Sequence, residues 1–304
     1  MDIGAHLPLI DFGDGPLTAA DLTSYARSCV DLNYAAIAAN DHLVFPRPWL
    51  DGLTALAAVA GGSGTLTLTT TVALPVVRGP ALLAKALASL DVLSGGRVVA
   101  ALGPGSSPLD YSAVGLDFEE RWQRLDEAVP AMRALWRGET YDGRFYSTRG
   151  ITMAPAPSQS GGPPVWLGSW GSAAGLRRVA RIADGWLASA YHTTPASFAD
   201  ARTRLADVLR ATGRADVDFP NAVATFFFQV TEDRAEAEEL VTRVLAPALN
   251  RSPEVLAERL AIGPSEVLTE RLTALHEAGV QRVYLWPLRD PHTQLELARD
   301  AWQG

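Results

Sequence analysis

The chain has 304 residues, of which 48% are hydrophobic and 20% are charged, so it can bury one large core. Its net charge of −8 at pH 7 and the lack of any basic stretch argue against binding to nucleic acid. Cys29 is the only cysteine, which excludes an internal disulfide. We expect a cytoplasmic protein without a membrane partner, because neither a signal peptide nor a run of roughly 20 apolar residues is present.

Short apolar or threonine-rich runs alternate with segments of helical periodicity along the whole chain. Strands are predicted over Ile3–Leu7, Tyr34–Asn40, Thr65–Leu74, Arg97–Leu102, Val165–Gly168, Gly185–Ala190, Ala222–Val230 and Val283–Trp286. Helices are predicted over Leu17–Asp31, Gly52–Ala60, Pro80–Leu93, Phe118–Trp136, Ser172–Ala183, Pro195–Thr212, Ala235–Leu249, Pro253–Leu260, Ser265–Ala278 and Thr293–Trp302. Between two of these, Tyr141–Ala154 carries turn signals and is expected to contain a hairpin.

Eight strands, each followed by a helix, predict a (β/α)8 TIM barrel with inserted segments, as a single domain over residues 1–304. A doubly wound open sheet is the alternative. Such a sheet usually has a Gly-x-Gly-x-x-Gly pattern after its first strand, and Gly4-Ala5-His6 does not match it. In a barrel, function is expected where the strands end, so residues at these ends are the candidates for a site.

Two histidines follow strand ends. His42 comes after the second strand and can exchange a proton near neutral pH, although a structural role in the loop Asp41–Trp49 is the alternative. Asp41 is not expected to pair with it, because neighbours in an extended segment point to opposite sides. His6 is expected in the core or in the pocket wall. The two histidines do not complete a metal site, and we expect no metal.

Two glycine-rich bends and several tryptophans also lie at strand ends. The run Gly168-Ser169-Trp170-Gly171-Ser172 precedes a helix, and exposed amides at a helix start suit a phosphate; an ordinary helix cap at Ser172 is the alternative. The bend Gly103–Ser107 could cradle a flat ring or merely connect two elements. Trp49 and Trp286 could wall an apolar pocket for a small-molecule substrate, whereas most tryptophans of the chain are expected in the core.

At these residues the sequence resembles the bacterial luciferase-like monooxygenase superfamily, and within it the branch that depends on the deazaflavin coenzyme F420. The resemblance rests on Asn40–Leu43, Thr70–Arg97, Gly103–Glu127 and Pro163–Trp186, together with the pattern AGVQRVYLWP near the carboxyl terminus. The second of these runs is specific to the superfamily, whereas the choice of cofactor depends on weaker differences.

The resemblance implies which residues hold the cofactor. Asp41 and His42 would contact the deazaflavin ring, with His42 also facing the substrate as the catalytic residue. Thr71-Val72 would form the family's non-prolyl cis peptide behind the ring. Gly105 and Ser106 would line the ring or its tail, and the loop Gly168, Ser169, Gly171 and Ser172 would hold the phosphate. A homodimer and a separate reductase that supplies reduced cofactor are also implied.

One position departs from the family pattern. Sugar-phosphate dehydrogenases of this branch have an acidic residue where this chain has Ser106, so an apolar substrate is expected instead. The first hypothesis is therefore an F420-dependent oxidoreductase that transfers a hydride between the deazaflavin and a small organic substrate. The alternatives are a two-component monooxygenase that uses reduced FMN and oxygen, and a flavin-binding barrel without turnover.

Overall fold

The computed structural model describes residues 1–13, 15, 17–215 and 217–302. Within these residues, nine parallel strands form one sheet in the order β6-β5-β4-β3-β2-β1-β9-β7-β8. A further pairing of β6 with β7 closes the sheet into a barrel, while β8 pairs only with the end of β7. The strands are β1 (Asp2–His6), β2 (Ala36–Ala39), β3 (Thr67–Thr70), β4 (Val98–Leu102), β5 (Val165–Gly168), β6 (Gly185–Ser189), β7 (Asn221–Val230), β8 (Ala261–Gly263) and β9 (Arg282–Pro287).

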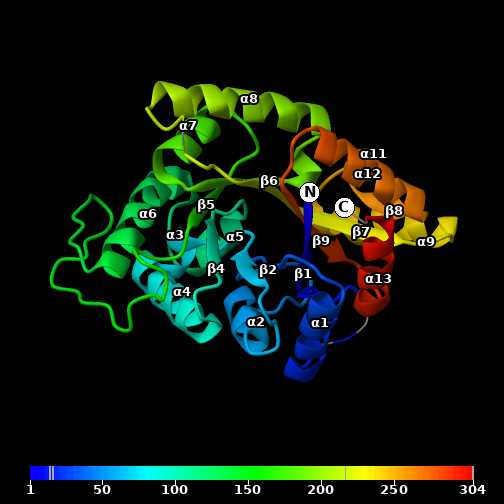
Figure 1. Cartoon of the computed structure of the whole chain (residues 1–304), viewed down its shortest axis with the longest axis horizontal. Coiled ribbons are helices and arrows are strands. Elements are labelled where there is room, and N and C mark those ends of the chain that lie inside the picture. Colours follow the sequence, from blue (N-terminus) through cyan, green and yellow to red (C-terminus); the bar gives the residue numbers. More distant parts are fainter. Residues whose placement is uncertain (14, 16, 216, 303–304) are drawn as a thin grey trace.

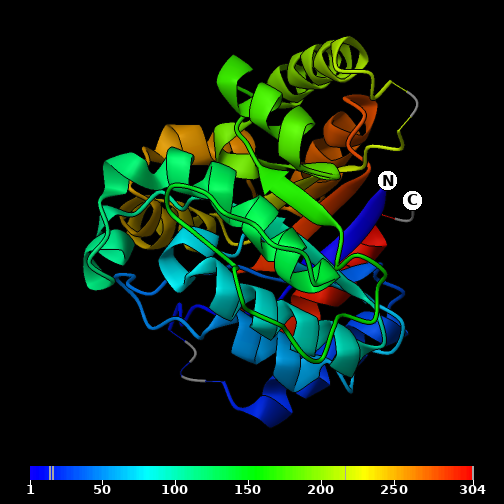
Figure 2. The same cartoon turned by 90° about the vertical axis from the view of Figure 1, so that its left-hand side faces the viewer.

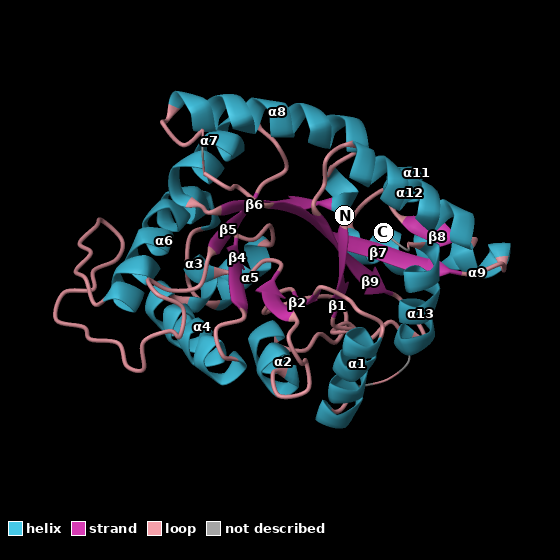
Figure 3. Cartoon of the chain, viewed as in Figure 1, coloured by secondary structure: helices cyan, strands magenta, loops and turns pink. Residues whose placement is uncertain are grey.

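Helices surround the barrel on all sides (Figures 1 and 3). They are α1 (Ala19–Asp31), α2 (Gly52–Val59), α3 (Pro75–Arg78), α4 (Pro80–Ser94), α5 (Pro108–Ala113), α6 (Arg121–Arg137), α7 (Ala173–Ile182), α8 (Pro195–Ala211), α9 (Arg234–Glu239), α10 (Ala246–Leu249), α11 (Pro253–Arg259), α12 (Ser265–Glu277) and α13 (Pro291–Ala301). The connection between α6 and β5 runs as a long green loop over the outside (Figure 2). It contains the expected hairpin contact, an antiparallel bridge between Asp142 and Ser147.

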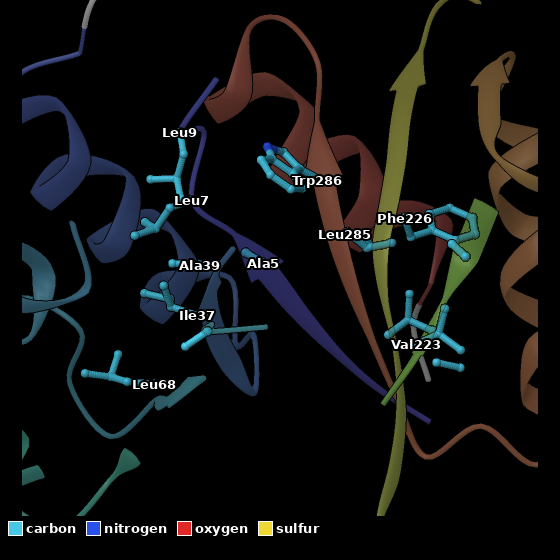
Figure 4. Packing of buried hydrophobic residues seen from close by; sticks show 14 of the residues in the cluster. Ala5, Leu7, Leu9, Ile37, Ala39, Leu68, Val223, Phe226, Leu285 and Trp286 are labelled. Atoms are coloured by element: carbon cyan, nitrogen blue, oxygen red, sulfur yellow. The ribbon is translucent and has the colours of Figure 1, made fainter. Parts of the chain in front are cut away.

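Buried side chains form two separate layers. The barrel interior is filled by small residues around a few large ones, namely Ala36, Ala38, Ala101, Trp166, Leu187, Ala222, Ala224 and Tyr284. A much larger cluster fills the space between strands and helices, and Figure 4 shows Ile37, Ala39, Leu68, Val223 and Leu285 as part of it. Because side chains alternate along a strand, each strand supplies both layers, which is the packing expected of a TIM barrel.

The predicted barrel and all eight of its strands are confirmed, with three differences. The third strand ends at Thr70 rather than Leu74, because a cis peptide bond follows at Thr71-Val72. The ninth strand, β8, was not predicted, since three residues carry no readable periodicity. The helix predicted over Ala235–Leu249 is divided by a π-helical segment, Leu240–Leu245. Along the described residues, no helix combines the length and apolarity needed to cross a bilayer.

We predict that Gly4→Ala destabilises the protein, because the added Cβ would lie 2.7 Å from Cδ1 of Tyr284 inside the barrel. Overpacking of this kind typically costs about 1–3 kcal/mol. The matched control is Gly61→Ala, where an added Cβ meets nothing within 4 Å. Urea denaturation of both variants measures the effect, and equal stabilities for the two would contradict the tight packing of the interior.

Candidate active site

The floor of the barrel mouth is built by His6, Thr71 and Trp286. Gly4, Thr69 and Tyr284, each two residues earlier in the chain, lie inside the barrel. Because side chains alternate along a strand, His6, Thr71 and Trp286 also point inward, one layer closer to the carboxyl ends of the strands. The ring of His6 stacks on Trp286, with centroids 3.4 Å apart and planes 9° apart. His6 and Trp286 therefore stack on each other at the mouth, while their part in a substrate pocket stays a prediction.

Both ring nitrogens of His6 are used within the protein. Nδ1 lies 2.9 Å from the carbonyl oxygen of Leu7, and Nε2 lies 3.0 Å from Oγ1 of Thr71. Since a carbonyl only accepts, Nδ1 carries the hydrogen and Nε2 accepts from the threonine hydroxyl. Burial lowers the pKa of His6 from 6.5 to about 3, so its ring is neutral at pH 7. His6 is a fixed structural group, without a free nitrogen for a ligand.

The peptide bond between Thr71 and Val72 is cis, as the family resemblance implied. The side chain of Val72 occupies space that two glycines leave open. A Cβ added to Gly103 would lie 2.7 Å from Val72 Cγ2, and one added to Gly168 would lie 3.1 Å from Val72 Cγ1. The ends of β3, β4 and β5 therefore meet at Val72, which brings three of the predicted segments together.

Asp41 is buried and binds protein groups with both carboxylate oxygens. Arg78 donates to Oδ2 through Nε at 2.7 Å and to Oδ1 through a terminal nitrogen at 2.6 Å, and the amide of Leu74 donates to Oδ2 at 3.1 Å. Arg78 also contacts Asp51, which caps α2. Asp41 thus anchors the chain that follows the cis peptide, and its contact with a bound ring stays a prediction. As expected, it does not pair with His42.

His42 pairs instead with Asp110, a residue that sequence analysis did not single out. Asp110 lies in the first turn of α5 with a fully buried side chain, and its Oδ2 is 2.8 Å from Nδ1 of His42. Its other oxygen accepts from the amides of Leu43 at 3.0 Å and Val44 at 2.8 Å. One carboxylate therefore fixes both the loop backbone and the imidazole that the loop carries.

This pairing decides which nitrogen of His42 can react. A carboxylate accepts hydrogen bonds, so Nδ1 donates to Asp110. No described residue forms a hydrogen bond with Nε2, and the side chain of His42 is 18% exposed. The arrangement therefore presents one basic nitrogen at the barrel mouth with a fixed tautomer, which is the geometry that proton transfer to or from a ligand requires.

Aromatic rings stand beside His42. The ring centroid of Trp49 lies 5.0 Å from that of His42, 4.6 Å from that of Phe45 and 5.6 Å from that of Trp286. The indole N–H groups of Trp49 and Trp286 are buried and have no hydrogen-bond partner. Trp49 and Trp286 therefore contact each other, while their part in a substrate pocket stays a prediction.

The loop after β5 is only partly available to a ligand. Ser169 is buried, and its hydroxyl accepts from the amide of Gly171 at 3.3 Å. Ser172 is exposed and caps α7 by accepting from the amide of Gly175 at 3.1 Å. The cap is thus observed, while phosphate binding at the remaining amides stays a prediction. Arg178 does not reach this loop, because it pairs with Asp126 on α6.

The bend after β4 and the loop after β6 complete the rim. Gly105 has a φ of +78°, a conformation that favours glycine, and Ser106 beside it is exposed. After β6, His192 stacks on Trp170 with centroids 3.7 Å apart, and Arg251 donates to Nε2 of His192 at 2.7 Å. Burial, and then the nearby arginines, lower the pKa of His192 to about 4. Sequence analysis gave no role to Arg251.

The described residues contain no group of three or more histidine, cysteine, aspartate or glutamate side chains suited to a metal ion. The mouth instead combines the His42–Asp110 pair, the apolar side chain of Val72 and the exposed residue Ser172 at the start of α7. Polar groups gathered at the carboxyl ends of the strands are typical of a TIM-barrel active site.

The chain belongs to the luciferase-like monooxygenase family, whose model matches residues 9–252. It is 30% identical over 217 residues to 5,10-methylenetetrahydromethanopterin reductase of Methanolobus tindarius, covering 71% of this chain and 64% of that protein. It is 32% identical over 180 residues to F420-dependent glucose-6-phosphate dehydrogenase of Microbacterium testaceum, covering 55% and 52%. The chain therefore matches less than two thirds of the length of either relative.

The fold is shared with the monooxygenase RslO1 from Streptomyces bottropensis, at a TM-score of 0.85 and 20% identity, over 100% of this chain and 99% of that one. At this identity the likeness concerns the fold alone. The two curated relatives are named as a reductase and a dehydrogenase, and the solved structure as a monooxygenase.

We predict that His6 makes stability fall as the pH decreases below about 6.5. The unfolded chain binds a proton near the ordinary histidine pKa of 6.5, whereas the folded chain keeps His6 neutral down to about pH 3. Linkage then removes up to about 1.4 kcal/mol per pH unit. Between pH 6.5 and 5, the wild type should lose about 2 kcal/mol more than His6→Phe in urea denaturation. His276→Gln, an exposed histidine, serves as control, and parallel pH profiles for wild type and His6→Phe would refute the prediction.

Asp110→Asn should change the tautomer of His42. A carboxamide has one oxygen for three donors, and its NH₂ group favours an unprotonated Nδ1, which moves the hydrogen to Nε2. Nitrogen-15 NMR of the imidazole at a pH where the ring is neutral measures this directly. Asp126→Asn, which alters a carboxylate bound to Arg178, should leave the His42 signals in place. An unchanged His42 tautomer in Asp110→Asn would show that Asp110 does not control it.

Proposed function

We propose that the protein is an F420-dependent oxidoreductase that transfers a hydride between the deazaflavin and a small, largely apolar organic substrate, with His42 as the catalytic residue. The observation that carries the proposal is the His42–Asp110 pair, which leaves Nε2 of His42 without a hydrogen-bond partner among the described residues at the mouth of the barrel. The name of the Microbacterium testaceum relative supports F420 as the cofactor.

The residues at the mouth fit such a group. Val72 offers an apolar surface, and Gly103 and Gly168 leave the room that this side chain fills. Gly105 and Ser106, in the bend after β4, would line the ring or its tail. The amides at the start of α7, next to Gly171 and Ser172, would hold a phosphate. When bound, the deazaflavin would supply the hydride chemistry, which no protein side chain can supply.

The protein would supply position and a proton. Asp110 keeps His42 in the tautomer whose Nε2 is available, so His42 would accept a proton from a substrate hydroxyl or return it to a substrate oxygen. The rings of Trp49 and Trp286 would keep water away from that oxygen. Asp41 would act at a distance, by fixing the loop through Arg78.

The proposal includes a homodimer and a separate enzyme that reduces the cofactor. A second candidate is an FMN-dependent monooxygenase, because the monooxygenase RslO1 has the same fold. Anaerobic titration of the purified protein with F420 and with FMN, followed by absorbance and fluorescence, separates the two. We expect micromolar or tighter binding of F420, and tight binding of FMN alone would overturn the F420 assignment.

His42→Ala should separate binding from chemistry. General acid–base groups contribute about 10²–10⁴-fold to turnover, so we expect at least a 100-fold loss of kcat with the dissociation constant of F420 within about threefold of wild type. The control is His276→Ala, an exposed histidine on α12. Unchanged turnover in His42→Ala would exclude it as the catalytic group, and a wild type that binds F420 but turns over no substrate would favour a cofactor-binding barrel without catalysis.

A further inference from the structure

The loops that follow β1 and β2 are joined into a short two-stranded ribbon. Ile10 and Trp49 form an antiparallel bridge, the amide of Leu50 donates to the carbonyl of Leu9 at 2.9 Å, and the amide of Asp11 donates to Pro48 at 3.0 Å. The ribbon holds Trp49 against His42 and Trp286. Figure 4 shows Leu9 beyond the end of β1 and the ring of Trp286 extending toward it from β9.

A cavity of about 330 Å³ lies between this ribbon and the segment that follows β9. Its walls are mainly apolar, and they include Leu9, Ile10, Phe12, Trp49, Leu50 and Leu288 besides several prolines. The volume lies at the lower end of the range of small-molecule sites. The segments that carry these residues all follow the carboxyl ends of strands, so the cavity opens at the same end of the barrel as His42.

The charges around the cavity disfavour an anion. Asp11 is the charged residue among its described walls, and Oδ1 of Asp11 accepts from the amides of Gly13 at 2.8 Å and Gly15 at 3.1 Å. No lysine, arginine or histidine belongs to the described lining. Arg47 lies outside this lining, with its Cζ 5.6 Å from the ring centroid of Phe12. A phosphorylated or carboxylated ligand would therefore enter a mainly apolar space with a negative charge and no cation in its described walls, which is costly.

Trp49 connects this cavity with the candidate active site. One ring belongs to the cavity wall and also lies 5.0 Å, centroid to centroid, from His42. A substrate whose apolar body fills the cavity would therefore need its reactive oxygen to reach past Trp49 in order to contact His42. The cavity itself contains none of the residues assigned to the cofactor, so it is free to hold a second molecule while the cofactor is bound.

We propose that this cavity is the site for the apolar body of the substrate, and that it selects uncharged, largely aliphatic or alicyclic molecules over anionic ones. The proposal deepens the proposed function and rests on it for the identity of the ligand as substrate. The ribbon carrying Ile10 and Trp49 is then the specificity element of the enzyme, because it lines the site of the apolar body and the reactive end of the substrate would have to pass Trp49 to reach His42.

The test compares two probes with equal numbers of heavy atoms, 2-decanone and nonanoate, by ligand-observed NMR titration of the cofactor-free protein. We expect 2-decanone to bind at least tenfold more tightly than nonanoate. Leu288→Trp, which fills the cavity, should weaken 2-decanone binding at least tenfold while leaving the circular dichroism spectrum unchanged. Equal affinities for the two probes, or 2-decanone binding unaffected by Leu288→Trp in a folded protein, would overturn the proposal.

A second variant decides the matter if the buried Leu288 does not tolerate tryptophan. Leu50 is 38% exposed and lines the cavity, so Leu50→Arg adds a cation there with little risk to folding. It should improve nonanoate binding at least fivefold, whereas Leu93→Arg, at a 68% exposed position on α4, should not. Equal effects of the two arginines would count against the cavity. Because neither probe experiment needs the cofactor, a failed F420 titration would remove the proposed function without removing the cavity as a binding site.

Discussion

Closure of the parallel sheet is the constraint on which the site depends. Once β6 pairs with β7, every strand ends at the same rim, and residues far apart in the sequence come into contact there. His6, Thr71 and Trp286 come from β1, the end of β3, and β9, yet they form one stacked and hydrogen-bonded layer. This layer is the floor on which the loops of the mouth are arranged.

The two histidines at the mouth have different roles because their partners differ. Both ring nitrogens of His6 form hydrogen bonds, one with Leu7 and one with Thr71, and burial keeps the ring neutral. The bond to Thr71 holds the segment with the cis peptide in place. In His42, Nδ1 donates to the buried carboxylate of Asp110, and Nε2 has no hydrogen-bond partner among the described residues. Both histidines were candidate site residues because both follow the ends of strands in the sequence. The number of nitrogens left free distinguishes the structural histidine from the one that can exchange a proton with a ligand.

The fold was largely predictable from the sequence, because buried strands and amphipathic helices leave a periodic pattern wherever they are long enough. The three residues of β8 leave none, and the end of the third strand depends on the Thr71-Val72 cis peptide, which only the family resemblance indicated. Asp110 was missed because its contact with His42 spans 68 residues and arises only when the barrel closes. The family resemblance implied that Asp41 contacts the cofactor ring, whereas in the structure both of its carboxylate oxygens accept from Arg78.

The proposed chemistry therefore depends on where the cofactor ring rests relative to His42. A crystal structure of the protein with F420, prepared without oxygen, measures this directly. We expect the ring to lie against Val72, with Nε2 of His42 facing it and the contact between His42 and Asp110 intact. A ring bound elsewhere, or a His42 side chain turned away from the mouth when the ring is present, would contradict the proposed mechanism.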